Sequence, residues 1–168
     1  MKIVVFSDSH GYTAGMERAM SFNSDADLVV FLGDGVADAE EVLENYPSVP
    51  FVKVSGNREQ YFADFLGGAT PDYEAVFVMG GVKFLAMHGH RPANVKHGVE
   101  GAAVYAKKKG ADVLLYGHTH EADDRVIETG DGGIRVINPG SVGARGDGTY
   151  AVLEVMDGNV VCGFGDVR

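Results

Sequence analysis

The chain has little cysteine, no tryptophan and no long apolar run. Its one cysteine, Cys162, has no partner for an internal disulfide and lies in an apolar alternation, which favours a small packed side chain over a reactive thiol. No apolar stretch approaches the ~20 residues of a membrane-spanning helix, and the N-terminus lacks the basic region and cleavage site of a secretory signal. These absences argue against thiol redox chemistry and membrane insertion, and they predict a cytoplasmic protein.

Positive charge is also scarce. Lys and Arg number 14 against 24 Asp and Glu, which gives a formal net charge of −10 and a pI near 4.9. Extended contacts with nucleic acid or with an anionic membrane need a basic face, so both are excluded as expected partners. An anionic ligand must therefore be attracted by a local feature.

What is present is the composition of a globular α/β protein. The 168 residues are 45% apolar and 23% charged, which predicts one domain spanning residues 1–168. Short β-branched runs, several continuously apolar as in strands buried on both faces, alternate with helical patterns. The expected strands are 2–7, 27–33, 50–56, 74–79, 82–89 and 112–118.

Two helical patterns and two hairpins complete the predicted elements. Residues 95–106 place Val95, Val99, Ala102 and Ala106 on one helical face, and Ala39, Leu43 and Tyr46 do the same in a second segment. Glycine-containing turns at 131–133 and 157–159 predict hairpins in the last third of the chain. The hairpins indicate either a second sheet or an antiparallel extension of the first.

Polar residues follow the predicted strands at their carboxyl ends, where ligands bind in open α/β sheets. Carboxylates, imidazoles and an amide are suitable ligands for first-row metals, and there are too many here for one ion. The sequence therefore predicts a site for two metals, with the ligands Asp8, His10, Asp34, Asn57, His88, His118 and His120.

Each of these short patterns alone has a simpler interpretation. A single D-x-H or H-x-H occurs more often in a solvated loop than in a metal site, and Asp34 could be a turn former. The shared position at strand ends is what favours the metal site. By contrast, His97 falls within a helical segment and is predicted to be a surface or packing residue, while His90 is ambiguous because it neighbours His88.

The motifs DSH, GD, GNRE, HGH and GHTH, in this order over residues 8–120, resemble the five motifs of the calcineurin-like metallophosphoesterases. The short length and NPGSVG at 138–143 are similar to the small bacterial YfcE-type phosphodiesterases. The resemblance implies a sandwich of two mixed β-sheets flanked by helices. It also implies hydrolysis of a small phosphate ester, expected to be a diester.

The resemblance further implies how the ligands divide. Asp8, His10 and His120 would bind one ion, Asn57, His88 and His118 the other, and Asp34 would bridge them. A hydroxide shared by the two divalent ions would attack phosphorus. Manganese is the expected metal, with Ni, Zn, Fe or Mg as alternatives, and the ions would attract phosphate to an acidic protein.

The expected catalytic residues are Asp34, Asn57 and Arg58. Arg58 stands where the family usually has histidine, or cysteine in the small bacterial branch, and a guanidinium binds a phosphoryl oxygen but does not release a proton. A second interpretation leaves Arg58 in solvent or paired with Glu59 or Asp64. Expected substrate contacts are His90 and Arg145, with Arg91 and Ser141 in the same loops.

Two other functions remain to be compared. A Vps29-like scaffold or binding module would share this fold without a competent metal site, and the complete ligand set argues against it. A metallo-β-lactamase-type hydrolase requires H-x-H-x-D-H, whereas residues 118–124 read HTHEADD. The physiological substrate, the metal used in the cell and the formation of a homo-oligomer stay open.

Overall fold

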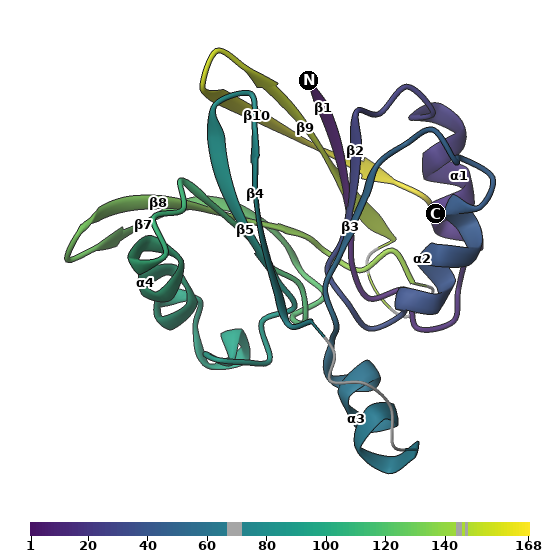
Figure 1. Cartoon of the computed structure of the whole chain (residues 1–168), viewed down its shortest axis with the longest axis horizontal. Coiled ribbons are helices and arrows are strands. Elements are labelled where there is room, and N and C mark those ends of the chain that lie inside the picture. Colours follow the sequence, from purple (N-terminus) through teal and green to yellow (C-terminus); the bar gives the residue numbers. More distant parts are fainter. Residues whose placement is uncertain (67–71, 144–145, 147) are drawn as a thin grey trace.

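The computed structural model describes residues 1–66, 72–143, 146 and 148–168, and it contains two five-stranded sheets (Figure 1). The first sheet has the order β10-β9-β1-β2-β3. Strands β1, β2 and β3 are parallel neighbours, and β9 and β10 extend the sheet antiparallel beyond β1. Its strands are β1 (Lys2–Phe6), β2 (Leu28–Phe31), β3 (Phe51–Lys53), β9 (Thr149–Met156) and β10 (Asn159–Asp166).

The second sheet has the order β4-β5-β6-β8-β7. Strands β5, β6 and β8 are parallel, whereas β4 and β7 are antiparallel to their neighbours. Each predicted hairpin of the last third thus joins a different sheet, and the expected pair of mixed sheets is confirmed. The strands are β4 (Glu74–Met79), β5 (Val82–Met87), β6 (Val113–Leu115), β7 (Ala122–Thr129) and β8 (Gly132–Pro139).

The continuously apolar strands are buried on both faces, as their sequences predict. In β1, Ile3 and Val5 pack in the layer between the two sheets, while Val4 and Phe6 pack with residues of α1 (Ala14–Phe22) and α2 (Val36–Leu43). In β5, Phe84 faces the central layer and Leu85 packs with α4 (Glu100–Lys108). Helices therefore cover the outer faces of both sheets (Figure 1).

The helical segment predicted over 95–106 is interrupted. A 3₁₀ turn, η1 (Val95–His97), ends at Gly98, whose φ of 117° lies in a region that favours glycine, and α4 begins two residues later. The apolar face is nevertheless correct, because Val95, Val99 and the two alanines of the pattern are all buried. His97 is exposed, as expected.

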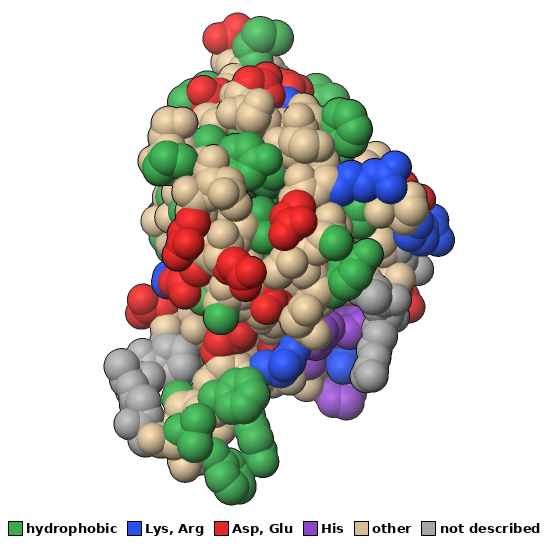
Figure 2. Space-filling view, turned by 90° about the vertical axis from the view of Figure 1, so that its right-hand side faces the viewer, with side chains coloured by type: hydrophobic (Ala, Val, Ile, Leu, Met, Phe, Trp, Pro, Cys, Tyr) green, Lys and Arg blue, Asp and Glu red, His purple; other side chains and the backbone are tan. Residues whose placement is uncertain are grey.

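One helix stands apart from both sheets. Helix α3 (Asn57–Leu66) projects from the end of β3, and none of its side chains is buried (Figure 1). It carries a row of exposed apolar groups at the base of the molecule (Figure 2): Tyr61, Phe62, Phe65 and Leu66.

The structure bears on two predictions of the sequence analysis, one about the single cysteine and one about membrane-spanning helices. Cys162 packs partly buried against the central layer, and burial raises the pKa of its thiol to about 11, so the thiol is protonated at neutral pH. Among the helices of the described residues, none combines the length and apolar character needed to cross a bilayer.

Candidate metal centre

All the predicted ligand residues lie at the carboxyl ends of strands. Asp8 and His10 follow β1, Asp34 follows β2, and Asn57 follows β3 as the first residue of α3. From the second sheet, His88 follows β5, and His118 and His120 follow β6. Because the two sheets face each other, these loops meet at one end of the sandwich, where histidine side chains gather on the surface (Figure 2).

One group of ligand atoms forms around Asp8. Its Oδ1 lies 3.1 Å from Nε2 of His120 and 3.6 Å from Nε2 of His10, and the two imidazole nitrogens are 3.2 Å apart. These three residues can each offer one atom within 4.8 Å of the others. They are the set that the motifs predict for one ion.

A second group forms around His88. Its Nε2 lies 3.1 Å from Nδ1 of His118, 3.2 Å from Oδ1 of Asn57 and 3.7 Å from Oδ1 of Asp34. The same nitrogen is 4.0 Å from Oδ1 of Asp8, so Asp8 also belongs to a cluster with Asp34 and His88. The two groups are thus adjacent. Asp8 belongs to both of them, whereas Asp34, the expected shared ligand, clusters with Asp8 and His88.

The surroundings of the Asp8 carboxylate indicate that a cation would fit between the two groups of ligand atoms. The side chain is fully buried; Oδ2 accepts hydrogen bonds from Ser7 Oγ at 2.5 Å and from the His118 amide at 3.0 Å, but Oδ1 has no hydrogen-bond donor. Burial acts to raise the pKa of Asp8, yet its contacts with His120, His88 and Ser7 outweigh burial and hold the pKa below its ordinary value. A buried ionised oxygen surrounded by imidazole nitrogens is an arrangement that a metal ion satisfies.

His88 is held in the tautomer that a metal ligand requires. Its Nδ1 lies 2.7 Å from the carbonyl oxygen of Leu32, so Nδ1 carries the proton and donates it. Nε2 then presents its lone pair to the centre of the site. The hydrogen bond from Nδ1 to a carbonyl is the one that a metal-binding histidine usually makes with its other ring nitrogen. For His118, burial and then the neighbouring His88 lower the pKa to about 4, which also leaves a neutral imidazole.

The backbone is strained at the same residues. Asp8, His10, Asp34, His118 and His120 all have φ between 52° and 70°, in the left-handed region that such residues enter at a cost of roughly 1–3 kcal/mol. Among the described residues, just one other non-glycine residue, Asp157 in the β9–β10 turn, has a positive φ. Strain concentrated on five candidate ligands indicates that the fold places these side chains for function and not for stability.

A glycine allows the two sheets to approach each other at this centre. A Cβ added to Gly117 would overlap the Ser7 hydroxyl and lie 3.0 Å from Asp8 Oδ2. The GHTH segment can therefore lie directly against the β1 loop, and the His118 amide can donate to Asp8. This close approach explains the glycine that precedes His118.

Glu59 organises the centre, a role that the sequence did not reveal. Its carboxylate accepts backbone hydrogen bonds from Gly56 at 2.7 Å, Gly35 at 2.8 Å, Asp34 at 2.9 Å and Val36 at 3.1 Å. Burial acts to raise the pKa of Glu59, but these four donors outweigh it and lower the pKa. Glu59 thus ties the Asp34 loop to the start of α3.

Glu59→Gln is expected to lower the free energy of unfolding at pH 7 by about 2–3 kcal/mol, because the amide loses the charge and turns an N–H₂ group toward N–H donors. Since the folded pKa lies below the ordinary value of 4.5, the stabilisation is present above that value and is lost as the pH falls through the folded pKa. Urea unfolding at pH 7 and in acid measures both effects. Glu41→Gln, at an exposed glutamate of α2, is the control; equal stability of the two variants at pH 7 would contradict the role of Glu59.

The expected substrate-contact residues have different positions. His90 lies beside the centre, with ring centroids 5.4 Å from His88 and 6.2 Å from His118, and its Nε2 is 3.1 Å from Gln60 Oε1. Arg91 instead stacks its guanidinium 4.3 Å from the ring centroid of Tyr73. Arg145 lies outside the described residues.

The expectation for Ser141 is wrong. Ser141 is buried, and its hydroxyl donates to the carbonyl of Asp8 at 2.8 Å while accepting from the Gly143 amide at 3.2 Å. The hydroxyl is therefore used to fix the strained Asp8 backbone and not to contact a substrate.

Arg58 points into the centre. Its Nη1 lies 3.2 Å from Nδ1 of His10, and its backbone amide donates to Asp34 Oδ1 at 2.8 Å. The alternative pairing with Glu59 does not form, because both oxygens of that carboxylate accept backbone hydrogen bonds.

Two facing mixed sheets with clustered carboxylates and imidazoles at their loop ends define the class of metal-dependent phosphoesterases. The calcineurin-like phosphoesterase superfamily domain matches residues 1–158, and the chain belongs to this superfamily. The resemblance carried by the five motifs is thereby confirmed. The family is metal-dependent, so the ligand cluster fits the chemistry of its members.

Individual relatives agree with this assignment. The probable metallophosphoesterase YsnB of Bacillus subtilis is 29% identical, covering 99% of this chain and 91% of the relative. A predicted phosphoesterase from Streptococcus pneumoniae has a similar structure, with a TM-score of 0.73, 25% identity and coverage of 99% and 92%. Vps29 of Entamoeba histolytica, solved with Zn²⁺, shares the fold at 20% identity, a TM-score of 0.64 and full coverage of both chains.

Proposed function

We propose that this phosphoesterase hydrolyses small phosphodiesters with two divalent metal ions held by the seven clustered side chains. The observation that carries the proposal is the buried Asp8 Oδ1, which has no hydrogen-bond donor and faces the nitrogens of His120, His10 and His88. A buried, ionised carboxylate oxygen needs a compensating positive charge, which a metal ion can supply.

The grouping of side chains supports two ions. Asp8, His10 and His120 would hold one, and the residues around His88, namely Asn57 and His118, would hold the other, with Asp34 shared. Carboxylate, imidazole and amide oxygen suit manganese, and they also suit Zn, Ni, Fe or Mg. When bound, such ions lower the pKa of water and neutralise phosphoryl oxygens.

The chain's own residues complete the reaction. The oxygen of water forms a bond to phosphorus and the water gives up a proton to solvent. The bond from phosphorus to the leaving oxygen breaks, and the displaced alcohol takes up a proton from solvent unless the leaving group is stable as an anion. Arg58, whose guanidinium reaches His10 Nδ1, would bind a phosphoryl oxygen through a charge-assisted hydrogen bond. Glu59 and Ser141 keep the Asp34 and Asp8 loops in place.

Bis(p-nitrophenyl) phosphate is expected to be hydrolysed with a kcat/KM about tenfold or more above that of p-nitrophenyl phosphate, an advantage of about 1.4 kcal/mol. A dianionic monoester is held best by several fixed cationic side chains. Among the described residues, Arg58 is the arginine in contact with a candidate metal ligand, His10. Both esters share a leaving group, so initial rates with equal manganese isolate substrate class. Faster hydrolysis of the monoester would contradict the diester preference.

The alternative is a non-catalytic, Vps29-like binding module. The exposed apolar side chains of α3, with Phe65 at 73% and Leu66 at 81% exposure, favour it because such surfaces commonly contact another protein. Metal-loaded protein that turns over neither ester would support the module and contradict the enzyme.

A further inference from the structure

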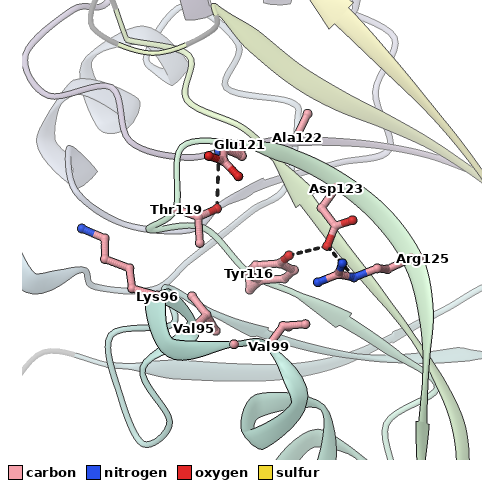
Figure 3. A pocket seen from close by; sticks show the side chains of 10 residues that line it. Val95, Lys96, Val99, Tyr116, Thr119, Glu121, Ala122, Asp123 and Arg125 are labelled. Atoms are coloured by element: carbon pink, nitrogen blue, oxygen red, sulfur yellow. Dashed lines mark hydrogen bonds and ion pairs between the residues drawn. The ribbon is translucent and has the colours of Figure 1, made fainter.

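A pocket of about 560 Å³ opens beside the metal centre on the side of the GHTH segment. Thr119, which stands between the ligand residues His118 and His120, forms part of its wall (Figure 3). The volume lies within the ~300–1,000 Å³ typical of small-molecule sites. A substrate with its phosphorus at the metal centre could therefore extend one substituent past Thr119 into this space.

The pocket has an apolar side formed by η1 and the residue that precedes α4. Val95 and Val99 line it and are almost fully buried, so their positions are fixed by the core around α4. Tyr116, at the end of β6, adds the face of a buried ring. A flat or ring-shaped group can contact this side without disturbing it.

The opposite side is polar and already organised. The Tyr116 hydroxyl donates to Asp123 Oδ2 at 2.6 Å, and the same oxygen lies 3.2 Å from Nε of Arg125 (Figure 3). Asp123 thereby holds the guanidinium of Arg125 at the pocket wall, with its terminal nitrogens available as donors.

Charges at the pocket balance. Lys96 and Arg125 are matched by Glu121 and Asp123, all four of which line the pocket. The pocket lining therefore has no net formal charge and does not favour a second anion.

From this arrangement we infer that the pocket bounded by Val99, Tyr116, Thr119 and Arg125 binds the second ester substituent of the substrate, and that this substituent is a polar, uncharged group of nucleoside size. A ring system would pack against Val99 and the Tyr116 ring, and its carbonyl or hydroxyl oxygens would accept from Arg125. Glu121 would accept from substituent hydroxyls. The inference rests on the proposed function, because it assigns a place to one arm of the diester.

Two diesters with the same leaving group test the assignment. Thymidine 5′-(p-nitrophenyl phosphate) carries a nucleoside substituent, and methyl p-nitrophenyl phosphate carries almost none. In the wild-type protein we expect a higher kcat/KM for the thymidine ester. Arg125→Met, which keeps a similar stem without the charge, is expected to lower the ratio of the two kcat/KM values about tenfold, through KM. Arg18→Met, on the distant helix α1, should preserve the ratio.

A binding measurement gives a readout that does not depend on turnover. Thymidine, which has no phosphate, is added to zinc-loaded protein while ¹H–¹⁵N amide signals are recorded. The signals of Gly98, Thr119 and Arg125 are expected to shift in the wild type and to shift less in Arg125→Met. Shifts confined to other residues, or none, would overturn the assignment.

The outcomes distinguish failure of the pocket assignment from failure of the proposed phosphodiesterase function. If the wild-type protein hydrolyses both diesters but the ratio is the same in Arg125→Met, the pocket assignment is wrong and the phosphodiesterase proposal stands. If the metal-loaded wild type hydrolyses neither diester, the proposed function is wrong and the inference fails with it.

Discussion

Replacing Asp34 by alanine is expected to lower kcat/KM for bis(p-nitrophenyl) phosphate by more than about 100-fold. Asp34 is buried at 3% exposure, and its Oδ1 lies 3.7 Å from His88 Nε2. It also faces the Arg58 amide at 2.8 Å, so it joins the metal centre to the start of α3. Loss of a group that merely hydrogen-bonds to a metal ligand costs roughly 10–100-fold, and loss of a shared ligand should exceed that.

The control for Asp34→Ala is the same substitution at an aspartate outside the metal centre. Asp64→Ala, at an exposed position on α3, should retain wild-type activity. Circular dichroism of both variants checks that the fold is kept. Metal-replete Asp34→Ala with undiminished turnover would contradict the assignment of Asp34 to the metal centre.

The second large effect concerns Arg58 and the leaving group. Hydrolysis by the wild-type protein is expected to slow steeply as the pKa of the leaving alcohol rises, because we expect none of the described residues to act as a positioned acid that protonates it. Arg58 stands where the family motif usually has histidine, and its guanidinium keeps its proton; His90 Nε2 faces Gln60 Oε1 at 3.1 Å. A positioned general acid contributes roughly 10²–10⁴-fold, so alkyl and nucleoside leaving groups should be cleaved far more slowly than p-nitrophenolate.

Arg58→His is expected to reduce this dependence. The measurement is a series of methyl phosphodiesters with leaving groups of increasing pKa, assayed for both proteins under conditions where chemistry limits the rate. Arg58→Gln, which has no titratable group, controls for loss of the guanidinium. A wild-type series that is flat against leaving-group pKa would show that another acid is present and that this role of Arg58 is wrong.

The position of the candidate metal centre could be predicted because strand ends are visible in sequence. Continuously apolar runs such as KIVVF and LVVF mark strands buried on both faces, and their carboxyl ends carry the polar residues. The family motifs then supplied the sheet arrangement and the order of ligands. Periodicity alone left the last two hairpins unplaced, because pairing partners such as β1 with β9 are distant in the chain.

The features that the sequence concealed depend on backbone geometry. Left-handed φ values at Asp8 and His118 could not be predicted from residue type, because Asp and His enter that region more often than most residues but still in a small minority of cases. The role of Glu59 was hidden for a related reason, because its four partners are backbone amides. Ser141 was misplaced because NPGSVG indicates a loop near the site without showing that its hydroxyl binds the Asp8 carbonyl.

The central claim is tested most directly by locating the metals. Crystals grown with manganese should give two anomalous-scattering peaks of comparable height among the seven candidate ligands, about 3.5–4 Å apart as in two-metal phosphatases. One peak should contact Asp8, His10 and His120, and the other should contact His88 and His118. A single peak in manganese-saturated crystals of active protein, or peaks away from these residues, would contradict the two-metal account.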